Sequence, residues 1–177
     1  RPLRMSDYDK AVLAIRDGNL EDFKKYASRV PYQQEQLLPE VAGRPGAVGR
    51  KMTELLMADR CNIDYDLYCE ACKKAIDIND PEKVLFMTER AQLCVADLEP
   101  SFHGEMAVYA YLDHRYIAKE IIHQCSAEQI AAAPSQLLEQ FAMDHDFRIL
   151  SELVEKGISG GSSSARTLHM LTYEGRD

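Results

Sequence analysis

A pattern of two helices joined by a short turn recurs along this chain, and it limits the fold more than any other feature of the sequence. Each copy has apolar residues at helical spacing, then a turn residue, and then a second stretch with one apolar stripe. The turns fall at positions 18, 79, 113 and 145, so the later ones are 34 and 32 residues apart. Strand-like alternation is rare. The sequence therefore predicts an all-α fold of repeated helix–turn–helix units.

The residues at the turns have a physical reason to be there. Gly18, Asn79 and Asp113 tolerate a left-handed backbone where a first helix ends. Pro81 directly follows one turn, near the start of the second helix. The backbone N–H that proline lacks would make no hydrogen bond within the helix at that position. The second helix of each unit should then bury one stripe. The predicted stripes contain Phe23 and Tyr26, Val84 and Met87, Ala118 and Ile121, and Leu150 and Leu153.

The first two turns are 61 residues apart, nearly twice the later spacing, which predicts a further unit between them. Met52, Leu55 and Leu56 stand where its second helix should be buried, which places the turn near Ala47. Its first helix must be irregular because it contains Pro39, Gly43, Pro45 and Gly46, and Pro45 and Gly46 should be exposed. The predicted units lie near 9–30, 37–60, 68–90, 104–125 and 135–158, with a partial unit at 165–177.

Two segments resemble the ankyrin repeat. Residues 166–176 (RTLHMLTYEGR) resemble the first helix and turn of such a repeat, and residues 58–66 (ADRCNIDYD) resemble its finger loop. The Thr-Pro-Leu-His motif of the family is lost in the earlier units. The resemblance implies an ankyrin-like solenoid of about five to six degenerate units in a single domain, 1–177. Another α-solenoid of paired helices is the alternative.

The ends of the chain suggest a segment of a longer protein. It does not begin with Met, and it stops where the last unit's second helix should start. An alternative interpretation makes residues 160–164 (GGSSS) a flexible linker and the remainder a tail. No stretch of 18 apolar residues is present, so no membrane span is expected.

The charge is negative and unevenly distributed. The net charge is -8, with a balance of +2 over residues 1–50 and −10 over residues 51–177. An acidic chain repels the phosphate backbone, so the expected partner is another protein with a basic surface and not a nucleic acid.

The cysteines point to free thiols in a reducing compartment, and we expect a cytoplasmic location. They are odd in number and scattered: Cys61, Cys69, Cys72, Cys94 and Cys125. The Cys69-x-x-Cys72 spacing has neither the context of a redox motif nor a second zinc-ligand pair, so we interpret it as small side chains packed on a helix.

No catalytic, cofactor-binding or metal-binding residues are predicted. His114 and His145 stand at turns, where a structural role is expected, and no phosphate-binding glycine loop is present. The acidic pairs Asp64/Asp66 and Asp97/Glu99 lack the central glycine and the spacing of a calcium loop.

The hypothesis is therefore a protein–protein interaction module that recruits its partner through a concave face and finger loops. The alternative is a substrate-recruiting domain of a larger enzyme, since irregular ankyrin-like arrays occur in bacterial effectors delivered into host cells, including enzymes of the OspC type. The predicted partner-binding residues lie on first helices and loops: Asp64, Tyr65, Lys73, Lys74, Asp97, Glu99, Tyr109, Tyr111 and Phe141. Tyr111 is expected to be exposed because it is next to a turn.

Overall fold

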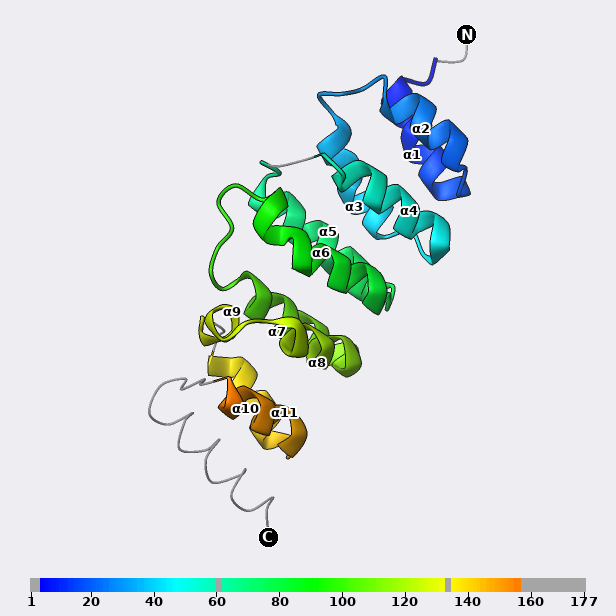
Figure 1. Ribbon diagram of the computed structural model, residues 1–177. Coiled ribbons are helices and arrows are strands. Elements are labelled where there is room, and N and C mark those ends of the chain that lie inside the picture. Colours follow the sequence, from blue (N-terminus) through cyan, green and yellow to red (C-terminus); the bar gives the residue numbers. More distant parts are fainter. Residues whose placement is uncertain (1–3, 60–61, 133–134, 157–177) are drawn as a thin grey trace. The chain divides into compact units, whose positions relative to one another are not determined.

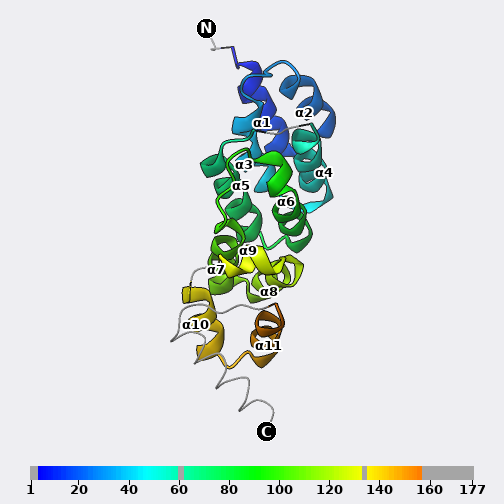
Figure 2. The same cartoon turned by 60° about the vertical axis from the view of Figure 1, so that its left-hand side comes forward.

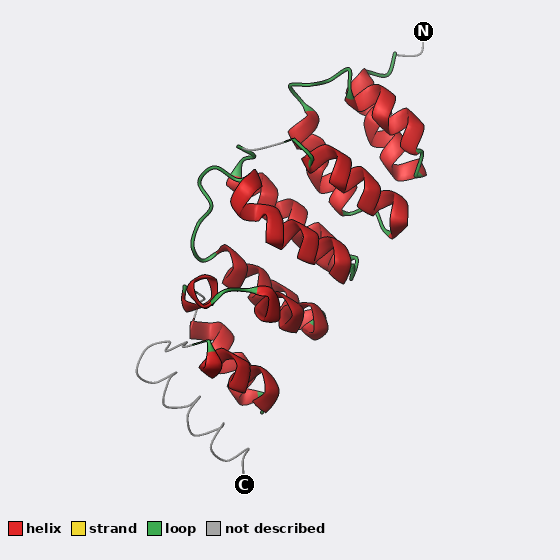
Figure 3. Ribbon diagram, viewed as in Figure 1, coloured by secondary structure: helices red, strands yellow, loops and turns green. Residues whose placement is uncertain are grey.

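The computed structural model describes residues 4–59, 62–132 and 135–156, and the chain divides into two compact units, one up to Leu98 and one from Glu99. The regular structure of the described residues is helical, apart from one isolated bridge between Ile63 and Val95 (Figure 3). The predicted all-α class is confirmed. The ankyrin assignment and a single continuous array remain predictions, and the predictions for residues 157–158, 160–164 and 165–177 lie outside the described residues.

The first unit consists of three stacked helix pairs. In each pair a first helix turns back into a second helix, and the pairs follow one another along the chain (Figure 1). The elements are α1 (Asp7–Asp17) with α2 (Leu20–Ala27), α3 (Leu38–Ala42) with α4 (Gly46–Met57), and α5 (Tyr65–Asp77) with α6 (Pro81–Cys94), and the 3-10 helix η1 (Gln34–Leu37) precedes α3. First helices pack on first helices, α1 on α3 and α3 on α5, while α2 packs on α4, as Figure 2 shows.

The second unit contains two pairs with a short helix between them. Its elements are α7 (Phe102–Asp113) with α8 (Arg115–Gln124), α9 (Ala127–Ala131), and α10 (Ser135–Met143) with α11 (Phe147–Glu155). Within this unit α10 packs on α7 and α11 packs on α8, so first helices again contact first helices. No helix in the described part of the chain is long and apolar enough to cross a bilayer.

Most of the predicted turns contain a residue with the left-handed backbone conformation that was expected there. Gly18 has φ of 68° and Asn79 has φ of 55°, both in the left-handed region, and His145 adopts the same conformation. The expectation for Asp113 is wrong. α7 continues through Asp113, and a single residue, His114 with φ of −137°, connects it to α8, so no left-handed residue is needed there.

The predicted stripes are buried, with one exception. Phe23, Val84, Met87, Ala118, Ile121, Leu150 and Leu153 are buried. Tyr26 is only half-buried, and cations of Lys10, Lys25 and Arg29 surround its ring at 5.2–5.5 Å from the ring centroid. Polar N-caps begin three second helices, where side-chain oxygens of Asn19, Asp80 and Asp146 accept backbone N–H groups.

The pair expected between the first two clear turns is present, with an irregular start as predicted. α3 has five residues, and Pro45 and Gly46 are exposed. The turn lies before Ala47 and not at it, because α4 already begins at Gly46. Leu56 is 5% exposed, as predicted, but Leu55 is 38% exposed, so its predicted burial is wrong. The buried stripe of α4 runs through Met52 and Leu56, and Leu55 lies beside it.

Candidate functional site

A groove of about 380 Å³ is lined by residues of the first helices of all three pairs in the first unit. That volume lies within the range of ligand-binding clefts. It opens near the ends of α1 and α3 and along one side of α5. Its lining combines apolar, glycine and charged residues: Ile15, Arg16, Pro39, Glu40, Gly43, Arg44, Pro45, Glu70 and Lys74.

One wall of the groove depends on the glycine that ends α1. The guanidinium of Arg44 lies against Gly18, and a Cβ at Gly18 would be 2.8 Å from the Nη2 atom of Arg44. Nη1 of Arg44 donates to the carbonyl of Arg16 at 2.7 Å, at the negative end of the α1 dipole. The Nε atom of Arg44 is buried and makes no hydrogen bond to a described residue. A cation from the second pair is therefore held over the turn of the first pair.

A similar contact occurs between the second and third pairs, where a cationic residue again lies close to a glycine of the preceding pair. A Cβ at Gly43 would be 3.7 Å from Cβ of Lys74, so the stem of Lys74 lies over the end of α3. Lys74 and Glu70 are both exposed, and neither makes an ion pair within the described residues. Arg16 and Glu40 form a pair at 3.9 Å, with both side chains substantially exposed. Such a pair is weak in water. The charges in the groove are consequently available to a ligand.

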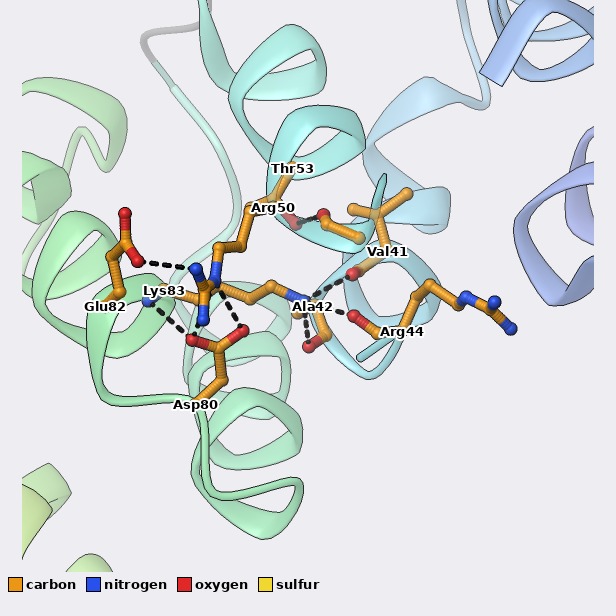
Figure 4. A network of polar contacts seen from close by, with 9 residues as sticks. Val41, Ala42, Arg44, Arg50, Thr53, Asp80, Glu82 and Lys83 are labelled. Carbon is orange, nitrogen blue, oxygen red and sulfur yellow. Dashed lines mark hydrogen bonds and ion pairs between the residues drawn. The ribbon is translucent and has the colours of Figure 1, made fainter. Parts of the chain in front are cut away.

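A buried network fixes the floor of the groove to the helix pair behind it (Figure 4). The ammonium of Lys83 donates to three carbonyls at the end of α3: Val41 at 3.0 Å, Ala42 at 2.9 Å and Arg44 at 2.6 Å. The last few carbonyls of a helix lack intrahelical partners, so Lys83 supplies the donors that α3 is missing. Burial lowers the pKa of Lys83 to about 8, and the nearby Asp80 carboxylate opposes that shift.

Asp80 joins the same network from the start of α6. Its carboxylate accepts the backbone N–H of Lys83, and it forms an ion pair with Arg50 of the preceding pair at 3.1 Å. The Asp80 side chain raises the pKa of Arg50 through this hydrogen bond and its charge. The second unit repeats the arrangement, because Lys119 of α8 pairs at 2.6 Å with Asp146, the N-cap of α11.

Lys156 repeats the lysine cap in the second unit. Its ammonium donates to the carbonyls of Ile122, His123 and Cys125, at 2.6, 3.0 and 2.9 Å, around the end of α8. Sequence reasoning did not find these caps. Each lysine lies 31 to 42 residues from the carbonyls that it contacts. The two lysines also occupy different positions in their helix pairs, so they form no recurring sequence pattern.

The predicted finger residues are partly brought together. The bridge between Ile63 and Val95 places two loops side by side, and the N–H of Ile63 donates to Cys94 at 2.8 Å. Asp64 and Asp97 stand just beyond the paired residues, both exposed. Asp64 also caps α5 by accepting the N–H of Leu67. The two loops therefore form an acidic edge on the first unit.

The other predicted residues divide between the surface and the core. Lys73 is exposed on α5, Glu99 is exposed at the start of the second unit, and Tyr65 and Tyr109 are half-buried. Tyr111 is only 4% exposed and Phe141 is fully buried, so the expected exposure of Tyr111 is wrong. Their rings form an edge-on pair with centroids 4.6 Å apart, because α7 packs on α10 at this point. These two aromatics hold the second unit together and are not available to a partner.

The cysteines behave as packed side chains. Among the described residues no disulfide bond joins Cys69, Cys72, Cys94 or Cys125, and Cys61 lies outside the described residues. Burial raises the pKa of the Cys72 thiol, and it raises that of Cys125 to about 12, so both stay protonated near neutral pH. The described part of the chain holds no group of three His, Cys, Asp or Glu side chains arranged for a metal ion.

Comparison with known proteins gives no relative from which a function could be transferred. No family model matches the chain, and neither a curated protein nor a solved structure matches it. The groove, the acidic edge and the packing described above are the features of the molecule that bear on its function.

Proposed function

We propose that the chain is a non-catalytic protein-binding module of ankyrin-like helix pairs, which recruits a protein partner through its first helices and the loops that follow its second helices. The groove across three first helices carries the proposal. Apart from Arg44, which binds the Arg16 carbonyl, its charged side chains make only the weak Arg16–Glu40 contact, whereas Asp80 and Lys83 of the buried network make several short polar contacts. Side chains left available on a concave face are typical of repeat-protein binding surfaces.

The acidic edge supports a role in steering the partner. Asp64 and Asp97 lie on adjacent loops of a chain with a net charge of -8. Clustered charge of one sign raises the association rate of a partner with a basic surface, and salt screens the effect. We propose that this edge speeds the encounter, and that contacts in the groove then hold the complex together.

The test begins with partner capture from a cytosolic extract, followed by binding kinetics with the identified protein. Asp64→Asn combined with Asp97→Asn removes two charges but keeps the α5 cap, because Asn caps helices as well as Asp. We expect a lower association rate, a weaker dependence on salt, and a nearly unchanged dissociation rate.

A matched control removes the same charge from the second helices, with Glu54→Gln on α4 and Glu89→Gln on α6, both exposed. This control should leave the association rate close to that of the unmodified chain. If both double variants slow association equally, the acidic edge has no special role. If no protein is captured specifically, the binding-module proposal itself is wrong.

A further inference from the structure

The groove of the first unit carries positive side chains although the chain as a whole is acidic. Arg16, Arg44 and Lys74 come from three successive helix pairs. Glu40 and Glu70 line the same groove, each four residues before a cation on its own segment. We call Arg16, Arg44 and Lys74 the cation row, and the 3.9 Å contact of Arg16 with Glu40 places one carboxylate beside it.

Neither Arg44 nor Lys74 is neutralised by a carboxylate among the described residues, and Arg44 is also held in place. The Arg44 guanidinium lies over Gly18 and is anchored by a carbonyl, which leaves its charge intact. The Lys74 stem lies over Gly43, and its ammonium has no carboxylate partner among the described residues. A guanidinium that is fixed before binding loses less conformational freedom when a carboxylate arrives. The groove is therefore preorganised to receive negative charge.

The spacing of the cations indicates the shape of the ligand. Neighbouring packed helices are about 8–10 Å apart, so cations on successive pairs should be separated by about that distance. An extended peptide in the polyproline II conformation advances about 3.1 Å per residue with three residues per turn, so the side chains of residues i and i+3 lie on one side, about 9 Å apart, and span one pair. Two carboxylates at positions i and i+3 of an extended segment match the row.

We propose that this groove binds an extended acidic segment of the partner protein, with two carboxylates three residues apart that contact Arg44 and Lys74. The inference rests on the proposed binding function and adds the chemistry of the ligand. A nucleic-acid strand fits less well, because Glu40 and Glu70 would face its closely spaced phosphates. In a peptide, by contrast, the acidic residues can be separated by neutral ones, so that its carboxylates contact the cation row while neutral residues lie beside Glu40 and Glu70.

The test uses fluorescence anisotropy of the full chain with three fluorescein-labelled, amidated peptides. They are Gly-Asp-Gly-Gly-Asp-Gly, the same peptide with both acids replaced by Asn, and Gly-Gly-Asp-Asp-Gly-Gly. We expect the first to bind most tightly, and Lys74→Gln to weaken its binding by about three- to tenfold, as for the loss of one charge contact. Lys74→Arg should retain binding. Lys51→Gln is the matched control, because Lys51 is an exposed lysine of α4 outside the groove.

Several results would overturn the inference. These are equal binding of the neutral peptide, unchanged binding by Lys74→Gln, or equal binding of the two acidic peptides. Tighter binding of a labelled oligothymidylate that displaces the peptide would assign the groove to nucleic acid instead. If the captured partner still binds the unmodified chain and the Lys74→Gln variant equally well, the ligand assignment is wrong while the binding-module proposal stands.

Discussion

Replacing Lys83 with methionine should destabilise the first unit, because it removes a charged donor from three carbonyls at once. Methionine keeps much of the volume of the lysine stem, so the change tests the ammonium more than the packing. Lys83 is 2% exposed and reaches from α6 to the end of α3. The Val41 carbonyl also accepts the backbone N–H of Arg44 at 3.2 Å, so it loses only one of its two donors.

The magnitude follows from two opposing contributions. A hydrogen bond from a charged donor contributes about 1.5–3 kcal/mol, so three contribute about 5–9 kcal/mol. Burial of the ammonium opposes this. The pKa of Lys83 falls from 10.5 to about 8, which corresponds to about 3 kcal/mol. We therefore expect Lys83→Met to cost about 2–6 kcal/mol near neutral pH, a range that includes the cost of breaking other buried charge contacts.

The same pKa shift predicts how the cost depends on pH. Below pH 8 both the folded and the unfolded chain carry the proton, so the burial cost is fully present. As the pH rises from about 8 to 10.5, the folded protein releases the proton before the unfolded chain does, so this group's contribution to stability becomes more favourable. The difference in stability between the unmodified chain and Lys83→Met should therefore grow across this window.

Hydrogen exchange resolved along the sequence is the appropriate assay, because the chain has two compact units and only the first contains Lys83. Protection of peptides that cover α3 and α6 should fall in Lys83→Met, whereas α7 and α8 should be unaffected. Lys51→Met is the matched control, an exposed lysine whose replacement should change stability by less than about 0.5 kcal/mol. The reasoning fails if the two variants are equally stable, or if their difference does not change between pH 8 and 10.

Three further substitutions can be checked by urea unfolding combined with the same exchange measurement. A Gly→Ala substitution normally stabilises a helix by about 1 kcal/mol. Gly49→Ala should instead destabilise α4 by about 1–3 kcal/mol, because the new Cβ would lie 1.8 Å from the carbonyl oxygen of Arg44. Leu56→Ala should cost about 2–5 kcal/mol and Leu55→Ala less than about 1 kcal/mol, and equal costs would contradict the assigned face of α4. Tyr111→Ala should cost about 3–5 kcal/mol in the second unit, and full exchange protection there would show that its ring is not part of the core.

The helix pairs could be predicted from the sequence where a turn residue and a clean apolar stripe occur together. Gly18 and Asn79 provide the left-handed turn, and Val84 and Met87 provide the stripe. α3 could be predicted only as irregular, because five residues are too few to show a periodicity.

The wrong prediction for Tyr111 has a similar origin. α7 is apolar around much of its surface, and its buried and exposed sides therefore cannot be separated by pattern alone. The structure buries Tyr111 and leaves the adjacent Leu112 72% exposed. Proximity to a turn was a poor guide to exposure, because the position of the neighbouring helix α10 decides which side is covered.

Lys74 was predicted as a binding residue, but the groove around it was not. Arg44 belongs to a different helix pair, and its side chain crosses to the carbonyl of Arg16, which is 28 residues earlier. Long side chains that act across pairs leave no periodic signal in the sequence. Gly18, which admits the Arg44 side chain, was recognised for its effect on the backbone and not for the space it provides.

The reach of Lys83 back to α3 also sets an order for folding during synthesis. A helix of five residues is too short to form by itself in water. Its terminal carbonyls receive their donor from a residue about 40 positions later, at the start of α6. When the chain emerges from the ribosome, α1 and α2 can close on each other at once, whereas we expect α3 to remain unformed until α6 has emerged. The second and third pairs should therefore fold together as one cooperative step.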